Sequence, residues 1–178
     1  MSFEHLANAV GRKALRDAVE GELRQPLEQL FDNFNSQAMA AASVAQVHAA
    51  NLKSGEKVVV KVIRPGIEKR IRNDIQLMYY FADKIEKRFE LGQVVGAVNL
   101  VKEFERTIFR ELDMLTEAGH IERFTQNFET IDEIYIPKVY WQHTAKSVLV
   151  MEHIEGIKMD NVAEITRHGI DPKQVALI

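Results

Sequence analysis

Lys61 stands in the middle of the most strand-like segment of the chain, VVVKVI at positions 58–63. Successive side chains of a strand point to opposite faces, so the valines on either side of the lysine should turn away from it. A fixed cation in such a place can hold the phosphates of a nucleotide, as phosphoryl transfer requires. The alternative is a solvated lysine on an edge strand, and the pattern alone favours neither.

Glu111 shares a predicted helical face with three apolar side chains, those of Phe104, Ile108 and Leu115. A carboxylate on an apolar face costs free energy unless it is paired, and removing one member of such a buried pair costs about 3–5 kcal/mol. We therefore expect Glu111 to pair with Lys61. The alternative is a carboxylate at the boundary of the face that is satisfied by Arg106, Arg110 or water.

A run of small residues precedes the strand segment, formed by Ala40, Ala41, Ala42 and Ser43. Small side chains let the backbone approach a ligand closely, although alanine lacks the freedom of glycine at positive φ. A protein kinase would have a glycine-rich loop here, and this chain has none. From the residues alone, a tightly packed turn is the simpler interpretation.

The segment from Val148 to Gly156, VLVMEHIEG, changes from apolar to polar and then reaches a glycine. This change is typical of the hinge of a kinase, where backbone N–H and C=O groups pair with adenine and side-chain identity matters little. Any strand that ends in a loop would give the same pattern, so this segment alone does not establish a nucleotide site.

The composition argues against several other kinds of site. The 178 residues carry a formal net charge of −3 and no cysteine, so neither a nucleic-acid surface nor a thiolate metal site is indicated. The six histidines show no metal-binding spacing, and we predict no metal site within the chain. We find no signal-peptide pattern and no apolar run of about 18 residues, since Gln93 and Asn99 interrupt the most apolar stretch, Leu91 to Val101.

Hydrophobic periodicity and turn residues predict the elements that must position these side chains. In chain order we expect a helix over 3–31 broken at Gly11, Gly21 and Pro26, a polar connector over 33–37, three antiparallel strands within 38–64 with a turn at Ser54-Gly55, helices over 67–89 and 98–128, strands over 134–141 and 147–151, a helix over 160–168 and a helical start at Asp171-Pro172. Five antiparallel strands with a packed helix form the small lobe of a protein kinase, so we predict an α+β fold of that kind.

Five blocks in this order resemble one family, the UbiB-type or ADCK-type atypical kinases, and its bacterial branch fits best. The blocks are AAASVAQVH (40–48), VVVKVIRPGIEKRIRNDI (58–75), FRELDMLTEAGHIERF (109–124), YIPKVYW (135–141) and VMEHIEGI (150–157). The order and spacing of the five blocks make the resemblance specific, and it spans about residues 25–178.

The resemblance implies a role for each singled-out position. The alanine-rich residues 40–43 would replace the glycine-rich loop, Lys61 would be the lysine of the third strand, and Glu111 would be the αC-type glutamate that pairs with it. Glu117 belongs to the same signature as Glu111. The residues of the adenine-facing hinge would be Met151, Glu152 and Ile154.

The resemblance also implies the architecture and the limits of the chain. We expect a helical extension over residues 1–36, a kinase-like N-lobe with a five-stranded antiparallel sheet over 37–156 that includes an αC-type helix and an extra inserted helix at 67–90, and the start of a C-lobe over 157–178. The KxGQ block, the catalytic loop, the metal-binding aspartate and the C-terminal membrane segments of the family are not among these residues. We therefore expect a truncated fragment that is inactive alone, with the rest of the C-lobe missing.

The function implied by the resemblance is that of the nucleotide-binding lobe of an atypical kinase or ATPase in ubiquinone (coenzyme Q) biosynthesis. Its cofactor would be ATP or ADP with Mg²⁺, whose protein ligands lie outside this chain. Its partners would be the nucleotide, a quinone-precursor lipid and other ubiquinone biosynthesis proteins, and it would be cytoplasmic and peripheral to the inner membrane. The alternative is an ATP-switched module that handles or scaffolds quinone precursors without phosphoryl transfer. A third possibility is an interaction domain without a ligand.

Overall fold

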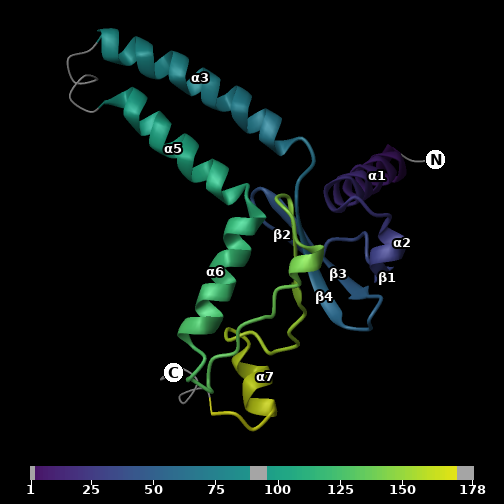
Figure 1. Cartoon of the computed structure of the whole chain (residues 1–178). Coiled ribbons are helices and arrows are strands. Elements are labelled where there is room, and N and C mark those ends of the chain that lie inside the picture. Colours follow the sequence, from purple (N-terminus) through teal and green to yellow (C-terminus); the bar gives the residue numbers. More distant parts are fainter. Residues whose placement is uncertain (1–2, 89–95, 172–178) are drawn as a thin grey trace.

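A five-stranded antiparallel sheet forms the centre of the molecule, and helices pack on both of its faces (Figure 1). The computed structural model describes residues 3–88 and 96–171, with the backbone alone for residues 3–10. The predicted α+β architecture is confirmed. In chain order the elements are α1 (Phe3–Leu23), α2 (Leu27–Leu30), β1 (Phe31–Phe34), β2 (Ala40–Ala41), β3 (Ala45–Leu52), β4 (Lys57–Ile63), α3 (Ile67–Arg88), α5 (Ala97–Glu111), α6 (Met114–Asn127), the 3-10 turn η1 (Trp141–His143), β5 (Val148–Glu152) and α7 (Val162–Arg167).

The strands are ordered β1-β3-β4-β5, and the short β2 also pairs with β3. β3 and β4 form the predicted hairpin, whose turn places Gly55 at φ 99°, a left-handed conformation that glycine adopts without a steric penalty. β4 has β3 on one side and β5 on the other, so that Lys61 lies opposite Val47 and Leu149. The lysine therefore stands on an inner strand, which excludes the edge-strand alternative.

One strand is not where the sequence predicts it. The strand expected over residues 134–141 does not form, and the segment makes only an isolated bridge between Val139 and Met151. Pro137 lacks an N–H and cannot take part in a regular ladder. The fifth strand is instead β1, which pairs with β3 where we expected a helix end and a polar connector. Burial of Phe31, whose side chain is 3% exposed, outweighs the local helical pattern.

α1 runs without interruption through Gly11 and Gly21, where breaks were expected. A glycine inside a helix costs about 1 kcal/mol relative to alanine. The burial of Leu15 and Val19 against the sheet offsets that cost. The helix does end before Pro26, the third expected break, which is the N-cap residue of α2.

The two faces of the sheet are packed by different helices, which lie on opposite sides of it in Figure 1. On what we call the α1 face, alternate strand residues form a buried cluster with α1 and α2. On the α6 face, the intervening residues form a second cluster with the α5–α6 junction. The strand members of the first cluster include Val58, Val60, Val62, Val148 and Val150, and the second cluster includes Ile63, Leu149, Leu112, Met114 and Ala118.

α3 and α5 form an antiparallel helical hairpin that projects away from the sheet (Figure 1). The hydroxyl of Tyr79 donates a hydrogen bond to Glu105 at 2.7 Å, and the backbone N–H of Val98 donates to Glu86 at 2.8 Å. Together with a small apolar cluster between the helices, these bonds fix which residues of α3 lie level with which residues of α5.

The single helix predicted over residues 98–128 is wrong, because the chain breaks at Leu112 and Asp113 and starts again as α6. Asp113 caps the new helix, since its carboxylate accepts a hydrogen bond from the N–H of Leu115 at 3.0 Å. The α5–α6 junction therefore changes the direction of the chain beside the sheet.

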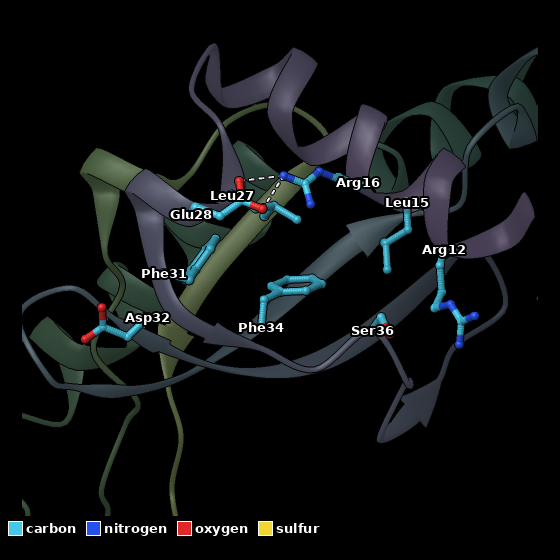
Figure 2. A pocket seen from close by; sticks show the side chains of 9 residues that line it. All are labelled: Arg12, Leu15, Arg16, Leu27, Glu28, Phe31, Asp32, Phe34 and Ser36. Atoms are coloured by element: carbon cyan, nitrogen blue, oxygen red, sulfur yellow. Dashed lines mark hydrogen bonds and ion pairs between the residues drawn. The ribbon is translucent and has the colours of Figure 1, made fainter. Parts of the chain in front are cut away.

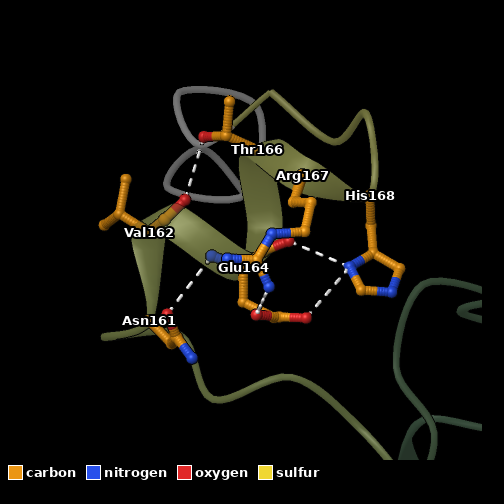
Figure 3. A network of polar contacts seen from close by, with 6 residues as sticks. All are labelled: Asn161, Val162, Glu164, Thr166, Arg167 and His168. Carbon is orange, nitrogen blue, oxygen red and sulfur yellow. Dashed lines mark hydrogen bonds and ion pairs between the residues drawn. The ribbon is translucent and has the colours of Figure 1, made fainter.

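α7 is the short helix predicted over residues 160–168. Asn161 caps it by accepting a hydrogen bond from the backbone N–H of Glu164 at 3.2 Å. The carboxylate of Glu164 in turn binds Arg167 at 2.6 Å and lies 3.7 Å from Nδ1 of His168 (Figure 3). These local contacts stabilise a helix of only six residues.

Some predicted segments extend past the described residues. The inserted helix, predicted to about residue 90, forms as α3 up to Arg88, and residues 89–95 lie outside the described part of the chain, as does the first half of the apolar stretch from Leu91 to Val101. The helical start at Asp171-Pro172 lies outside it from position 172 onward. Of the helices that the structure describes, none combines the length and apolarity needed to cross a membrane.

Candidate functional site

Lys61 is held by Glu117, which lies one turn into α6. The ammonium Nζ is 2.8 and 2.7 Å from the two carboxylate oxygens. The two side chains are 22% and 38% exposed, so the ion pair is partly shielded from water and open on one side. The valines that flank the lysine are buried on the α1 face, as the alternation of a strand predicts. β4 thus presents one ammonium toward α6.

The partner of Lys61 is Glu117 and not Glu111, which corrects the expected ion pair. Glu111 is the last residue of α5 and is exposed. The break at Leu112 and Asp113 means that residues before and after it do not share one helical face, so the spacing used to place Glu111 does not hold. Glu117 was noted only as part of the family signature, and its position in α6 brings it to the lysine.

Lys61 and Glu117 line an open pocket of about 640 Å³ at the α5–α6 junction. The pocket has the size of a small-molecule site. Its lining is polar and carries both signs of charge, which suits a phosphate-bearing ligand better than an apolar one. The other lining residues are Thr107, Arg110, Glu111, Asp113, Thr116 and His120, so Glu111 does lie at the site although it does not bind Lys61.

Several of these lining residues were not found from the sequence. Asp113 offered a signal, because aspartate directly before an apolar run is a typical N-cap. Thr107 and Arg110 could have been placed near the site only by their spacing from Glu111, which they precede on the same helix. His120 lies three residues beyond Glu117, so its place in the pocket becomes predictable once α6 is known to begin at Met114.

The alanine-rich segment forms the tip of a hairpin between β2 and β3. The backbone N–H of Ala42 donates to the carbonyl of Ala45 at 3.0 Å, and the side chains of residues 40–43 are exposed. Ala40 lies opposite Val47, which in turn lies opposite Lys61. Directly opposed residues of an antiparallel sheet share a face. The side chain of Ala40, at the start of the hairpin, therefore lies on the α6 face in line with Val47 and Lys61.

Arg64 anchors this hairpin to the end of β4, a role that the sequence did not reveal. Its guanidinium donates to the carbonyl of Ala42 at 3.0 Å and to that of Ala45 at 3.4 Å. Its backbone N–H donates to the carbonyl of Val44 at 2.9 Å. Since Arg64 follows Lys61 closely along the chain, the turn and the lysine are tied to the same strand end.

A turn at Lys146 and Ser147 fixes the distance between β4 and α6. The carbonyl of Lys146 accepts from the N–H of Met114 at 2.9 Å, and the carbonyl of Ser147 accepts from the N–H of Ile63 at 2.9 Å. Glu22 of α1 accepts from the N–H of Ser147 at 3.3 Å. Met114 lies one helical turn before Glu117, and Ile63 lies two residues after Lys61. The two carbonyl contacts therefore position the glutamate and the lysine relative to the same turn.

The predicted hinge residues Met151, Glu152 and Ile154 lie at and just after the end of β5. Met151 packs against the apolar cluster of the α6 face. The carboxylate of Glu152 accepts hydrogen bonds from the hydroxyl of Tyr135 at 2.7 Å and from the N–H of Lys138 at 3.2 Å. The bond to Glu152 raises the pKa of the Tyr135 hydroxyl. Contact of this strand end with adenine stays a prediction.

A lysine on an inner strand, paired with a glutamate on a packed helix beside a short hairpin, is the arrangement of a protein-kinase-like small lobe. Residues 3–177 match the family model described as ABC1 atypical kinase-like domain, and the chain belongs to that family. The resemblance found in the sequence is therefore confirmed.

Similar proteins support the same assignment. The chain is 45% identical over 161 residues to the probable protein kinase UbiB of Marinobacter nauticus, covering 90% of this chain and 29% of that protein. It is 40% identical over 158 residues to the probable protein kinase UbiB of Azotobacter vinelandii, covering 89% and 29%. Among solved structures, the complex of Rv3197 with erythromycin from Mycobacterium tuberculosis matches with a TM-score of 0.72 and 30% identity, covering 91% of this chain and 39% of that one. The chain thus spans under a third of the length of these two curated relatives.

Proposed function

We propose that this chain forms the nucleotide-binding lobe of an ABC1-family atypical kinase or ATPase that acts in ubiquinone biosynthesis. The observation that carries the proposal is the contact of 2.7 Å between Lys61 and Glu117 on the open side of an inner strand. Two relatives are named probable protein kinase UbiB, which supports the reaction class and the link to ubiquinone.

Lys61 would hold the phosphates of ATP or ADP. Its ammonium has three donors, and the two contacts with Glu117 leave one direction for a phosphate oxygen. Glu117 would keep the ammonium in place, and the hairpin of residues 40–43, tied down by Arg64, would cover the phosphates with its backbone. The strand end at residues 151–154 would meet the adenine.

Phosphoryl transfer would also need the positive charge of Mg²⁺ on the phosphates. The aspartate and asparagine of a kinase catalytic loop, and the aspartate of a metal-binding triplet, have no counterpart among the 178 residues. We therefore expect nucleotide binding but no phosphoryl transfer by these residues alone. Robust magnesium-dependent release of phosphate from ATP by the 178-residue chain would contradict this expectation.

The test is a titration with a fluorescent ATP analogue. Lys61→Met should weaken binding by about tenfold or more, equivalent to about 1.4 kcal/mol. Lys57→Met is a matched control on the same strand, because the side chain of Lys57 is exposed and forms its ion pair with the exposed Glu155. It should bind the analogue as tightly as the unaltered chain. Equal affinity of Lys61→Met and Lys57→Met would refute the role of Lys61.

A second candidate function, the handling of quinone-precursor lipids without phosphoryl transfer, is favoured by the helical hairpin of α3 and α5. Large apolar side chains on it stay exposed, namely Leu77, Met78, Tyr80, Phe81, Ile85, Leu100 and Phe104. An exposed apolar surface of this kind marks an interaction site. A short-chain quinone-precursor analogue should raise the melting temperature if this candidate holds, and nucleotide alone should raise it otherwise.

A further inference from the structure

A hollow of about 330 Å³ lies between α1 and β1 on the α1 face of the sheet (Figure 2). Its apolar walls are Leu15 of α1, Leu27 at the start of α2, and the two phenylalanines of β1. The rings of Phe31 and Phe34 have centroids 5.6 Å apart. Small-molecule sites have volumes of about 300–1,000 Å³ and combine apolar walls with a few polar groups. This hollow has the size for one ring.

Three charged groups of the hollow have partners on the protein. Arg16 binds Glu28, which Figure 2 shows across the upper rim, and Asp32 binds Lys53 at 2.7 Å. Arg12 also lines the hollow but has no hydrogen bond or ion pair with any side chain that the structure describes. Its guanidinium can therefore bind an anion without first breaking a contact.

A second hollow of about 510 Å³ adjoins the first and shares Arg12, Leu15 and Ser36 with it. Its remaining lining is largely polar and includes Gln37 and Gln46. Arg12 thus lies where an apolar compartment meets a polar one. A ligand that matches this division has an apolar ring, an anionic group attached to it, and room for polar substituents beyond the anion.

From this division we propose that the groove between α1 and β1 binds a small aromatic carboxylate. The ring lies on Phe34, the more exposed phenylalanine of β1, and the carboxylate accepts hydrogen bonds from the guanidinium of Arg12. The groove is on the opposite face of the sheet from Lys61, so this site is independent of the proposed nucleotide site. A neutral ring of the same shape gains the apolar contact and lacks the charge-assisted one.

The test follows backbone amide signals of isotope-labelled protein by NMR during titration with benzoate. Benzamide, which has the same ring and no charge, is the control ligand. Benzoate should give saturable shifts confined to the amides of residues 12–16 and 31–37. Its affinity should exceed that of benzamide by about tenfold, as expected for one charge-assisted contact.

Two variants make the test specific. Arg12→Gln removes the charge at an exposed position of α1 and should abolish the preference for benzoate over benzamide. Lys13→Gln removes the charge of an exposed neighbour that lines neither hollow, and it should keep the preference. A preference that survives in Arg12→Gln overturns the proposal. Benzoate shifts that fall elsewhere, or no saturation up to about 20 mM, overturn it as well.

Discussion

The two faces of the sheet are made by the same strands, yet over β4 and β5 they differ in how completely they are closed. On the α1 face, Val58, Val60, Val148 and Val150 are all 0% exposed. On the α6 face, Lys61 remains 22% exposed beside a polar pocket. Val60 of β4 therefore belongs to the core, and Lys61 beside it belongs to the candidate site. A substitution of Val60 should therefore lower the stability, and a substitution of Lys61 beside it should weaken nucleotide binding.

Val60→Ala should have the largest effect on stability. It removes two methyl groups from a site that is 0% exposed and leaves a cavity in the α1 face. The free energy of unfolding should fall by about 2–3 kcal/mol, measured by urea denaturation. The folded fraction should keep its affinity for nucleotide. A loss of affinity in the folded fraction would break the division between the two faces.

Glu117→Gln and Glu111→Gln compare the two carboxylates of the pocket. Glu117→Gln weakens the contact that holds the ammonium of Lys61, and we expect nucleotide affinity to fall by about tenfold, or about 1.4 kcal/mol. Glu111→Gln alters an exposed carboxylate and should change affinity by less than about twofold, or about 0.4 kcal/mol. Both affinities can be measured by calorimetry. The reverse ranking would restore Glu111 as the partner of the lysine.

Lys61→Met should change stability little, in contrast to Val60→Ala beside it. The ion pair with Glu117 is only partly shielded, and such pairs contribute less than about 1 kcal/mol to folding. Urea denaturation of this variant should therefore give a free energy close to that of the unaltered chain. A loss above about 2 kcal/mol would mean that the α6 face depends on the pair for its stability.

His48 gives a way to probe the α1 face with pH, and its effect should be the smallest. It shares that face with Val60, is 0% exposed, and its Nδ1 lies 3.0 Å from the carbonyl oxygen of Asn35. Burial lowers the pKa of the His48 imidazole, although the hydrogen bond with Asn35 partly opposes this. The unfolded chain therefore takes up the proton first, near pH 6.5.

The stability that neutral His48 provides is thus fully present above about pH 6.5 and is lost as the pH falls below that value. The melting temperature should decrease between pH 7.5 and pH 5.5. His48→Gln, which cannot take up a proton in this range, should show a smaller decrease. An identical decrease in both proteins would assign the pH dependence to other groups.

Most of the sheet and its lysine could be predicted because their signals are local. The valine-rich run around Lys61 predicts a strand, and Ser54-Gly55 marks the hairpin that puts β4 beside β3. The resemblance to a kinase lobe followed from the order of five sequence blocks, which can be recognised without knowing the structure. The inserted helix was also predicted from the correct residue, Ile67, and it is helical as far as the described residues extend, to Arg88.

The partner of the lysine could not be predicted because it depends on contacts that are distant in sequence. α6 begins where Met114 binds the carbonyl of Lys146, and no periodicity in the helical segment encodes that bond. A single uninterrupted helix through Leu112 was assumed, and it led us to expect Glu111 beside Lys61, where Glu117 lies. The fifth strand was misplaced for a similar reason, since burial of Phe31 decides its conformation.

Lys61 and Glu117 of the candidate site are held in place by different kinds of contact. β4 pairs with β3 from Ile63 to Lys57 and with β5 from Val62 to Val58, so both of its edges are hydrogen-bonded. A sliding or tilting of the lysine would require both ladders to come apart. The first turn of α6, by contrast, is held by the hydrogen bond from Met114 to the carbonyl of Lys146, by the ion pair of Glu117 and by apolar packing against the sheet. Opening or closing of the pair should therefore move α6 and repack its buried side chains, because a movement of β4 would break both ladders.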